Sequence, residues 1–402
     1  MTRFGIEEEF LLVDRSTLVP LAMADGTRER LAPEGGGRIL PEFLTSQFEC
    51  VTDPLSSITD AAAQLRNLRA ALAAHAAPLD AVIAASGTPF NTTGRATISA
   101  SPHYDRVSAQ LGAISRGHEV NGLHVHVEVA DAEERVRALN RLRGWLPVLL
   151  ALTGNSPFAE GAATGFASWR SILIRRLPAT WTPPWFHDLA DYEGQVDRLI
   201  ALSAIPERSS LSWAARLSDR FPTVESRVCD AQLSIDDTLF AAALTRAIVV
   251  AHDGPASAAP VEQLDAGLWV AARHGMAATI TDPTTGETTD AWAATHRLLD
   301  VVRHALEQLG DAEFVTAHID RLRREGTGAE RQLRAHAHDG LRGLRRLHLA
   351  GSDTGEFTGD FVTEPAAESA AESAAESAED PPQDPPKRSE FPASALHVRG
   401  RE

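Results

Sequence analysis

Alternating apolar and polar residues mark four stretches of the chain, as expected for strands with one buried face. We predict strands at residues 3–14, 44–52, 120–129 and 221–234. Apolar residues at helical spacing predict helices over residues 59–85, 131–152 and 236–251, and over most of 261–350 with breaks near 282–288 and 326–328. We therefore expect strands and helices to be mixed along the first 350 residues.

The C-terminal segment, residues 351–402, differs in composition from the rest of the chain. It repeats a short Ala/Glu/Ser unit, becomes rich in proline, and carries twelve Asp/Glu residues against four Lys/Arg residues. Such a segment lacks the apolar side chains that offset the loss of chain entropy on folding. We predict a disordered acidic tail there and one folded domain over residues 1–350, and we favour a solvated appendage over a functional tail.

The net charge of −17 argues against nucleic acid as the main partner, because binding a phosphate backbone needs a basic surface. A small phosphorylated ligand needs only local cations. The chain has two cysteines, so we expect no disulfide framework and a reducing, cytoplasmic location. No uninterrupted apolar run reaches membrane-spanning length, so we expect no membrane span.

The first predicted strand carries three consecutive carboxylates in the stretch FGIEEEFLLVD. Because alternate residues of a strand share a face, Glu7 and Glu9 lie on one face and Glu8 on the other, which is otherwise apolar. We expect Glu8 at the edge of that apolar face. Two carboxylates on one face repel each other unless a cation lies between them, so Glu7 and Glu9 predict a divalent metal site. A solvent-facing pair is the alternative.

Two further strands offer ligands with the same spacing. His124 and His126 share a face opposite apolar neighbours, where imidazoles can bind a metal or meet phosphate, although a solvated pair has the same pattern. Glu49 follows Gln47 two residues later in TSQFEC and adds one more carboxylate.

In the fourth strand, TVESRVCD, strict alternation places Thr223, Glu225, Arg227 and Cys229 on one face and Asp230 on the other. A carboxylate beside a guanidinium suits a metal-bound phosphate, although a simple Glu–Arg pair has the same pattern. Carboxylates from several strands suit hard cations such as Mg²⁺ or Mn²⁺, which leave positions open for nucleotide phosphates. The chain has no GxxxxGK[ST] P-loop, so metal ions and arginines would have to hold the phosphates of ATP.

Six motifs follow one another along residues 3–350: GIEEEFLLVD, SQFECVTDP, SGTPF, NGLHVHVEV, NSPF with TGFASWRS, and RLSDRFPTVESRVCDAQLSIDD. Together they resemble the carboxylate–amine ligases of the glutamate–cysteine ligase type 2 family, also called YbdK-like. The resemblance implies an α+β, glutamine-synthetase-like fold, in which a curved and mostly antiparallel sheet lines the active site and helices pack behind it. It also implies an ATP-dependent ligase that forms an amide through an acyl phosphate, with γ-glutamylcysteine as product.

The resemblance also implies roles for individual residues. It implies metal ligands at Glu7, Glu9, Glu49, His124 and Glu225; catalytic residues at Arg216, Arg227 and Glu225; and substrate-binding residues at Arg170, Thr223 and His126. ATP with Mg²⁺ or Mn²⁺ would be the cofactors, and a carboxylate such as glutamate and an amine such as cysteine the substrates. Two positions depart from the family pattern, since Glu128 stands where glycine is usual and Leu217 where proline is common.

Two other functions stay open. A metal-dependent amide hydrolase would use His124, His126 and a carboxylate around an activated water. A non-catalytic relative would bind nucleotide or an amino acid without turnover. The pattern of several glutamates with arginines favours the ligase over the hydrolase. The oligomeric state is open, with a homodimer as one option.

Overall fold

The computed structural model describes residues 2–23, 33–92, 94, 96–252 and 259–350. The tail predicted to be disordered, residues 351–402, lies outside the described residues. Within the described part of the chain, no helix combines the length and the apolar character needed to cross a lipid bilayer.

A seven-stranded antiparallel sheet forms the centre of the fold. Its strands are β1 (Phe4–Asp14), β2 (Arg38–Pro41), β3 (Gln47–Val51), β4 (Ala81–Ala84), β5 (Gly122–Glu128), β10 (Ala215–Leu217) and β11 (Thr223–Asp230). They run in the order β10–β11–β5–β1–β3–β2, and β4 pairs with the C-terminal half of β1. The four strands predicted from the sequence are confirmed as β1, β3, β5 and β11.

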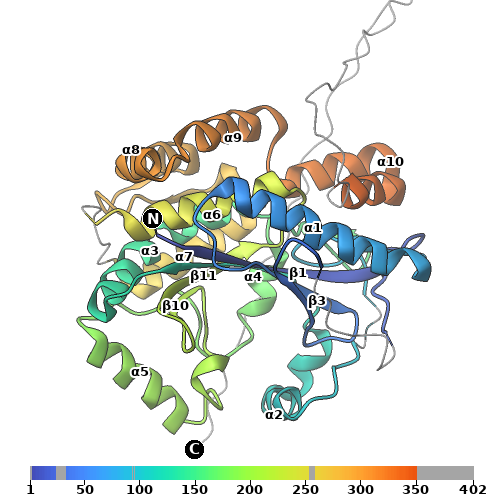
Figure 1. Cartoon of the computed structure of the whole chain (residues 1–402), viewed down its shortest axis with the longest axis horizontal. Coiled ribbons are helices and arrows are strands. Elements are labelled where there is room, and N and C mark those ends of the chain that lie inside the picture. Colours follow the sequence, from blue (N-terminus) through green and yellow to red (C-terminus); the bar gives the residue numbers. More distant parts are fainter. Residues whose placement is uncertain (1, 24–32, 93, 95, 253–258, 351–402) are drawn as a thin grey trace, which may run out of the picture. The chain divides into compact units, whose positions relative to one another are not determined.

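Helices lie on both sides of this sheet. The longer ones are α1 (Ile58–Ala76), α3 (Ala132–Thr153), α6 (Ile235–Val250), α7 (Val261–His274), α8 (Ala291–Leu309), α9 (Ala312–Glu325) and α10 (Gly328–Ala350). The shorter ones are α2 (Pro102–Leu111), α4 (Trp169–Ile174) and α5 (Leu189–Ala201). Figure 1 shows α1, α6, α8 and α9 on one side of the sheet, with α2 and α5 on the other.

Several short strands and 3₁₀ turns connect these elements. The strands are β6 (Phe158–Ala159), β7 (Ala162–Ala163), β8 (Thr180–Trp181), β9 (Ser212–Trp213), β12 (Thr279–Thr281) and β13 (Thr288–Asp290). The turns are η1 (Ala77–Leu79), η2 (Gly112–Gly117), η3 (Arg208–Ser210) and η4 (Gly275–Ala277). The expected break near residues 282–288 is confirmed, because the β12–β13 hairpin separates α7 from α8 there.

The face of the sheet toward α3 and α6 is the hydrophobic core. Leu123, Val125 and Val127 of β5 are completely buried there, in one cluster with apolar side chains of both helices. Because alternate residues of a strand point to opposite faces, the polar residues of β5 emerge on the other side of the sheet. The core therefore fixes which side chains face the opposite surface, and the predicted α+β architecture is confirmed.

Glu8 lies inside this core, so the prediction that it lies at the edge of the apolar face is wrong. The side chain is fully buried. Arg69 of α1 donates to both carboxylate oxygens, from Nη2 at 2.5 Å and from Nε at 3.1 Å. Thr238 of α6 donates a third hydrogen bond to Glu8. A buried carboxylate is tolerated here because its charge and its hydrogen bonds are met by partners from two helices.

Two local predictions are also wrong. The predicted helix over residues 59–85 ends at Ala76, because the apolar residues after the η1 turn form β4 and pair with β1. In β11 the register shifts between Ser226 and Cys229, so that one extra residue is accommodated. Beyond this bulge the alternation is reversed. Cys229 therefore packs in the core, and Asp230 lies on the face that carries Glu225.

Candidate active site

The register of the sheet gathers the predicted ligands on the face opposite the core. Directly paired residues of neighbouring strands lie about 5 Å apart, so side chains distant in the sequence meet there. The pairs are Glu7 with His124, Glu9 with Glu49, Glu225 with His126, and Arg216 with Glu225.

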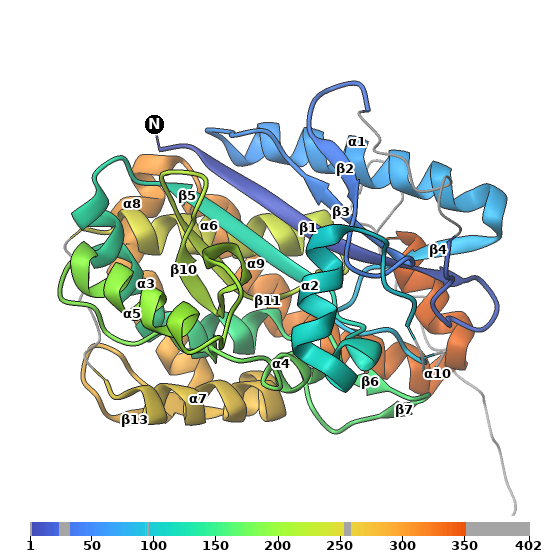
Figure 2. The same cartoon turned by 90° about the horizontal axis from the view of Figure 1, so that it is seen from below.

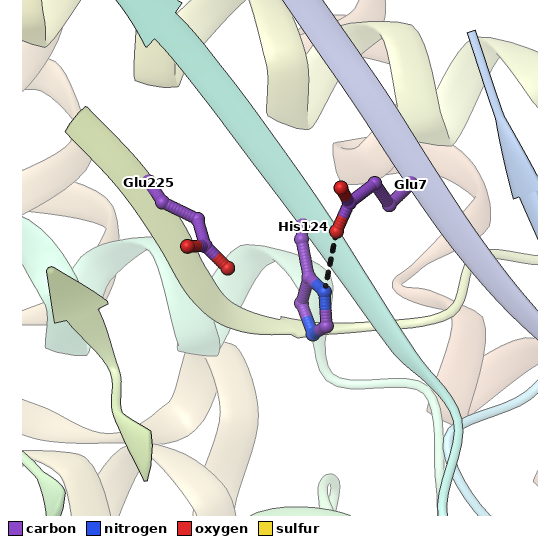
Figure 3. Close-up of side chains that lie close together, drawn as sticks. All are labelled: Glu7, His124 and Glu225. Carbon is purple, nitrogen blue, oxygen red and sulfur yellow. Dashed lines mark hydrogen bonds and ion pairs between the residues drawn. The ribbon is translucent and has the colours of Figure 1, made fainter. Parts of the chain in front are cut away.

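Glu7, His124 and Glu225 form what we call the first cluster. Figure 3 shows these side chains converging from β1, β5 and β11. One ligand atom from each lies within 4.8 Å of the others, and Glu7 Oε2 is 3.2 Å from His124 Nδ1. Burial by itself would raise the pKa of Glu7, but interactions with His124 and His126 outweigh it and hold the pKa well below its ordinary value. Glu7 is therefore ionised at neutral pH.

Glu225 lies between two guanidinium groups. Arg216 donates to its two oxygens, from Nε at 2.6 Å and from Nη2 at 3.2 Å, and Arg227 donates through Nη1. Burial would raise the pKa of Glu225, but the charges of Arg227 and Arg216 lower it far below its ordinary value. The carboxylate thus keeps its negative charge although it is completely buried.

Glu9, Glu49 and His124 form the second cluster, which shares His124 with the first. Their ligand atoms also lie within 4.8 Å of one another. Burial, together with the charges of Glu7 and Glu42, raises the pKa of Glu49 well above its ordinary value. Negative charge is therefore in excess at the second cluster, which a bound cation would relieve.

Glu42 adjoins the second cluster, and the sequence prediction missed it. It follows β2 at the tight connection to β3, where its backbone N–H donates to Gln47 O at 3.1 Å. Burial and the charge of Glu9 raise the pKa of Glu42 to about 7. Tyr104 of α2 donates its hydroxyl to Glu42 Oε2 at 3.0 Å.

Arg170 projects from α4 toward the same face. Its Nη2 donates to the backbone oxygen of Arg227 at 3.3 Å, and its Nη1 lies 3.8 Å from Asp230 Oδ1. Asp230 is itself held by hydrogen bonds from the hydroxyls of Ser156 and Ser168, at 2.7 and 2.8 Å. Arg170 is thereby fixed in a buried position, and this burial lowers its pKa from the ordinary value.

Gly122 leaves room for this arrangement. A Cβ atom at this position would lie 2.5 Å from Arg170 Nη2 and 2.9 Å from His124 Nε2. The backbone N–H of Gly122 also donates to Glu9 Oε2 at 2.6 Å. Only glycine therefore lets the guanidinium of Arg170 and the imidazole of His124 approach the backbone this closely.

A cavity of about 250 Å³ continues from the second cluster. Glu9, His124, Arg170 and Arg227 contribute to one side of its lining. Other lining residues come from α2, from α4 and the turn after it, from residues 204–212, and from further segments around the clusters. Figure 2 shows α2 and α4 close together beside the strands. The clusters therefore open onto a space with room for a small molecule.

Comparison with known proteins shows the family of this chain. The family model for Glutamate-cysteine ligase family 2 (GCS2) matches residues 3–356. The chain belongs to glutamate–cysteine ligase family 2. It is therefore an ATP-dependent ligase that forms a carbon–nitrogen bond, as predicted from the six motifs.

Named relatives of this family 2 ligase cover most of the chain. A "Putative glutamate–cysteine ligase 2-1" of Nocardia farcinica is 38% identical over 341 residues, which is 83% of this chain and 89% of the relative. A protein of the same name from Saccharopolyspora erythraea is 39% identical over 333 residues, covering 82% of this chain and 88% of the relative.

Two solved structures resemble the fold of this family 2 ligase. Glutamate–cysteine ligase from Francisella tularensis, in complex with AMP, has a TM-score of 0.67 at 15% identity, over 88% of this chain and 89% of that chain. A bifunctional glutathione synthetase from Pasteurella multocida has a TM-score of 0.63 at 16% identity, over 87% of this chain and 52% of that chain. These similarities confirm the predicted fold class.

All ten residues predicted for the site of this family 2 ligase lie on the polar face of the sheet or line the adjoining cavity. They are Glu7, Glu9, Glu49, His124, His126, Arg170, Arg216, Thr223, Glu225 and Arg227. Their individual roles remain predictions. Glu128, which departs from the family pattern, lies at the margin of this polar face. Arg3 donates to both of its oxygens there, at 2.6 and 2.9 Å.

The donor atoms fit a divalent cation. Each cluster offers two carboxylates and an imidazole, a set that Mg²⁺ and Mn²⁺ accept. The buried Nε2 of His126 lies 3.3 Å from Glu7 Oε1, and this contact helps to hold the pKa of Glu7 low. At the second cluster the carboxylates crowd together and the pKa of Glu49 is raised, which a bound cation would relieve.

Proposed function

We propose that this ligase joins a carboxylate such as glutamate to an amine such as cysteine. The carboxylate attacks the γ-phosphorus of ATP, the bond to the bridging oxygen breaks, and ADP leaves with the electron pair. The amine nitrogen then attacks the acyl carbon, the bond from that carbon to the phosphate oxygen breaks, and phosphate departs with a proton from the amine. Phosphorylation is needed because a carboxylate ion is a poor electrophile at neutral pH.

The observation that carries the proposal is the pair of carboxylate clusters that share His124. We assign Mg²⁺ or Mn²⁺ to their side chains, which are Glu7, Glu9, Glu49, His124 and Glu225. When bound, such ions would supply positive charge that neutralises the phosphates during transfer. The absence of a P-loop from the sequence supports this mode of phosphate binding.

Two arginines are assigned to the transferring phosphoryl group. Arg216 and Arg227 keep Glu225 ionised, and they lie beside the first cluster, where negative charge develops during transfer. Removing a donor that stabilises developing charge costs about 10²–10³ in rate. We therefore regard Arg216, Arg227 and Glu225 as the catalytic residues.

Arg170 is assigned to the carboxylate-bearing substrate. It lines the cavity next to the second cluster, and its buried Nε has no hydrogen-bond partner. A guanidinium with an unused donor suits bidentate binding of a carboxylate. We also assign His126 and Thr223 to substrate binding. Their side chains are 3.0 Å apart, which orients the imidazole.

Formation of ADP from ATP, Mg²⁺, glutamate and single amines tests the proposal. Glu225→Gln keeps the shape of the side chain and removes its charge, so we expect ADP formation to fall at least 10²-fold. Glu128→Gln is the matched control, because Glu128 lies at the margin and pairs with Arg3. We expect that variant to keep its activity. Near-normal ADP formation by Glu225→Gln would contradict the assignment.

The same assay distinguishes the ligase from the two alternative functions, an amide hydrolase and a non-catalytic binder. Amide cleavage without ATP would support a hydrolase, and nucleotide binding without turnover would support a non-catalytic binder. A cytoplasmic location and a homodimer stay predictions. The two cysteines, Cys50 and Cys229, are both free and buried.

A further inference from the structure

Four apolar side chains line one side of the cavity and lie outside the hydrophobic core. They are Val107 and Leu111 of α2, Ile174 of α4, and Leu177 just after it. Each is half-buried, and none belongs to the hydrophobic clusters of the described residues. Between Ile174 and Leu177, Arg176 donates to the backbone oxygen of Gly117 in η2, the turn after α2, at 2.8 Å. We call these four residues the apolar wall.

Two polar side chains of α2 beside the apolar wall already hydrogen-bond to other parts of the protein. Tyr104 donates its hydroxyl to Glu42, and Gln110 donates to the backbone oxygens of Ser203 and Ala204, at 3.0 and 2.7 Å. These bonds anchor α2 on both sides of the cavity. The surface that α2 presents to a ligand here is therefore mainly apolar. Burying this surface against a ligand lowers the free energy of binding.

The carboxylate-bearing substrate is assigned to Arg170 on the polar side of the cavity, so the ligands left to cover the apolar wall are the amine and the base of ATP. The acyl phosphate must be shielded from water, so we place the reacting phosphate where the first cluster adjoins the cavity, next to Arg227, which lines it. The nucleoside then extends the opposite way, past the first cluster toward His126. An aromatic side chain is available there, because Phe221 is 58% exposed and its ring lies 6.4 Å from that of His126. The amine is therefore the ligand that would cover the apolar wall.

We propose that the preferred acceptor is a primary amine that carries an extended apolar group, larger than the side chain of cysteine. This inference rests on the proposed ligase function and specifies its second substrate. One carbon and one sulfur atom span too little to cover side chains from both α2 and α4. A branched aliphatic or aromatic group can contact both, while its nitrogen faces the acyl carbon beside the second cluster.

The test is a panel of amines in the ADP assay with Mg²⁺, ATP and glutamate. Leucine, isopentylamine, phenylalanine and 2-phenylethylamine carry the extended apolar group, and alanine and cysteine do not. We expect kcat/KM to be at least tenfold higher for the best of the first four than for alanine and cysteine. If cysteine or alanine is the best substrate, the inference is wrong while the ligase function stands. If no amine supports ADP formation, both fail.

Variants of the apolar wall show which ligand uses it. Leu111→Asn and Leu177→Asn should lower kcat/KM for the best apolar amine about tenfold, with the rate for alanine and the Kd for ATP unchanged. Leu333→Asn is the control, because Leu333 is 38% exposed on α10, outside the cavity lining. A higher Kd for ATP in the wall variants, with unchanged amine preference, would assign the wall to the nucleotide base and overturn the inference.

Discussion

Replacing Arg69 with methionine tests whether the middle carboxylate of the first strand has a purely structural role. Arg69 is buried and donates to both oxygens of Glu8 and to the backbone oxygens of Gln232 and Leu233. Arg69→Met leaves the Glu8 carboxylate buried without its cation. Breaking a buried ion pair from one side costs about 3–5 kcal/mol in the free energy of unfolding.

This cost converts into a measurable fall in Tm. An unfolding entropy of about 2.1 cal/mol/K per residue, over about 350 residues, gives roughly 0.7 kcal/mol/K. Arg69→Met should therefore lower Tm by about 4–7 °C in calorimetry. Combining it with Glu8→Met removes both charges and should recover at least about 1 kcal/mol of the loss.

Activity provides the second readout of these variants. Glu8 points away from the two clusters, so Arg69→Met should still form ADP at temperatures well below its Tm. The reasoning is refuted if Tm falls by less than about 1 °C. It is also refuted if the double variant is less stable than Arg69→Met, because an uncompensated charge would then not be the cause.

Three further predictions concern other parts of the chain. Gly122→Ala should lower kcat/KM for glutamate about 10²-fold in the ADP assay, because its Cβ would displace Arg170; a value near that of the parent chain would contradict this. Burial would raise the pKa of Asp237, but Arg331, His318 and Arg321 hold it well below its ordinary value, so its stabilisation is present above about pH 4 and is lost as the pH falls. Asp237→Asn should lower Tm most at pH 6 and least near pH 3, and an equal loss at both would reject the assignment. Deleting residues 351–402, predicted to be a solvated tail, should leave kcat unchanged, whereas a large drop would show that the tail participates.

Alternation along single strands was enough to predict most of the site. Glu7 and Glu9 share a face, as do His124 and His126, because the backbone of β1 and β5 is regular there. Which strands are neighbours cannot be obtained from alternation. The six motifs indicated the family and its mostly antiparallel sheet, but the order β11–β5–β1–β3 was not predicted and comes from the structure.

The wrong predictions concern residues whose positions depend on contacts with distant parts of the chain. One extra residue in β11 moved Asp230 to the polar face and Cys229 into the core, and no residue type in TVESRVCD announces a bulge. Glu8 was misplaced because its partner Arg69 lies 61 residues away on another element. Glu42 was missed because β2 is only four residues long and was not predicted as a strand.

Titration with Mn²⁺ in the presence of ADP, followed by electron paramagnetic resonance, tests the central claim most directly. If glutamates from separate strands hold the cations beside the nucleotide, the parent chain binds more than one Mn²⁺ per molecule. Glu7→Gln and Glu49→Gln should each weaken or lose one of these ions, and Glu128→Gln should keep them all. Equal Mn²⁺ binding by the parent chain and by both cluster variants would contradict the account.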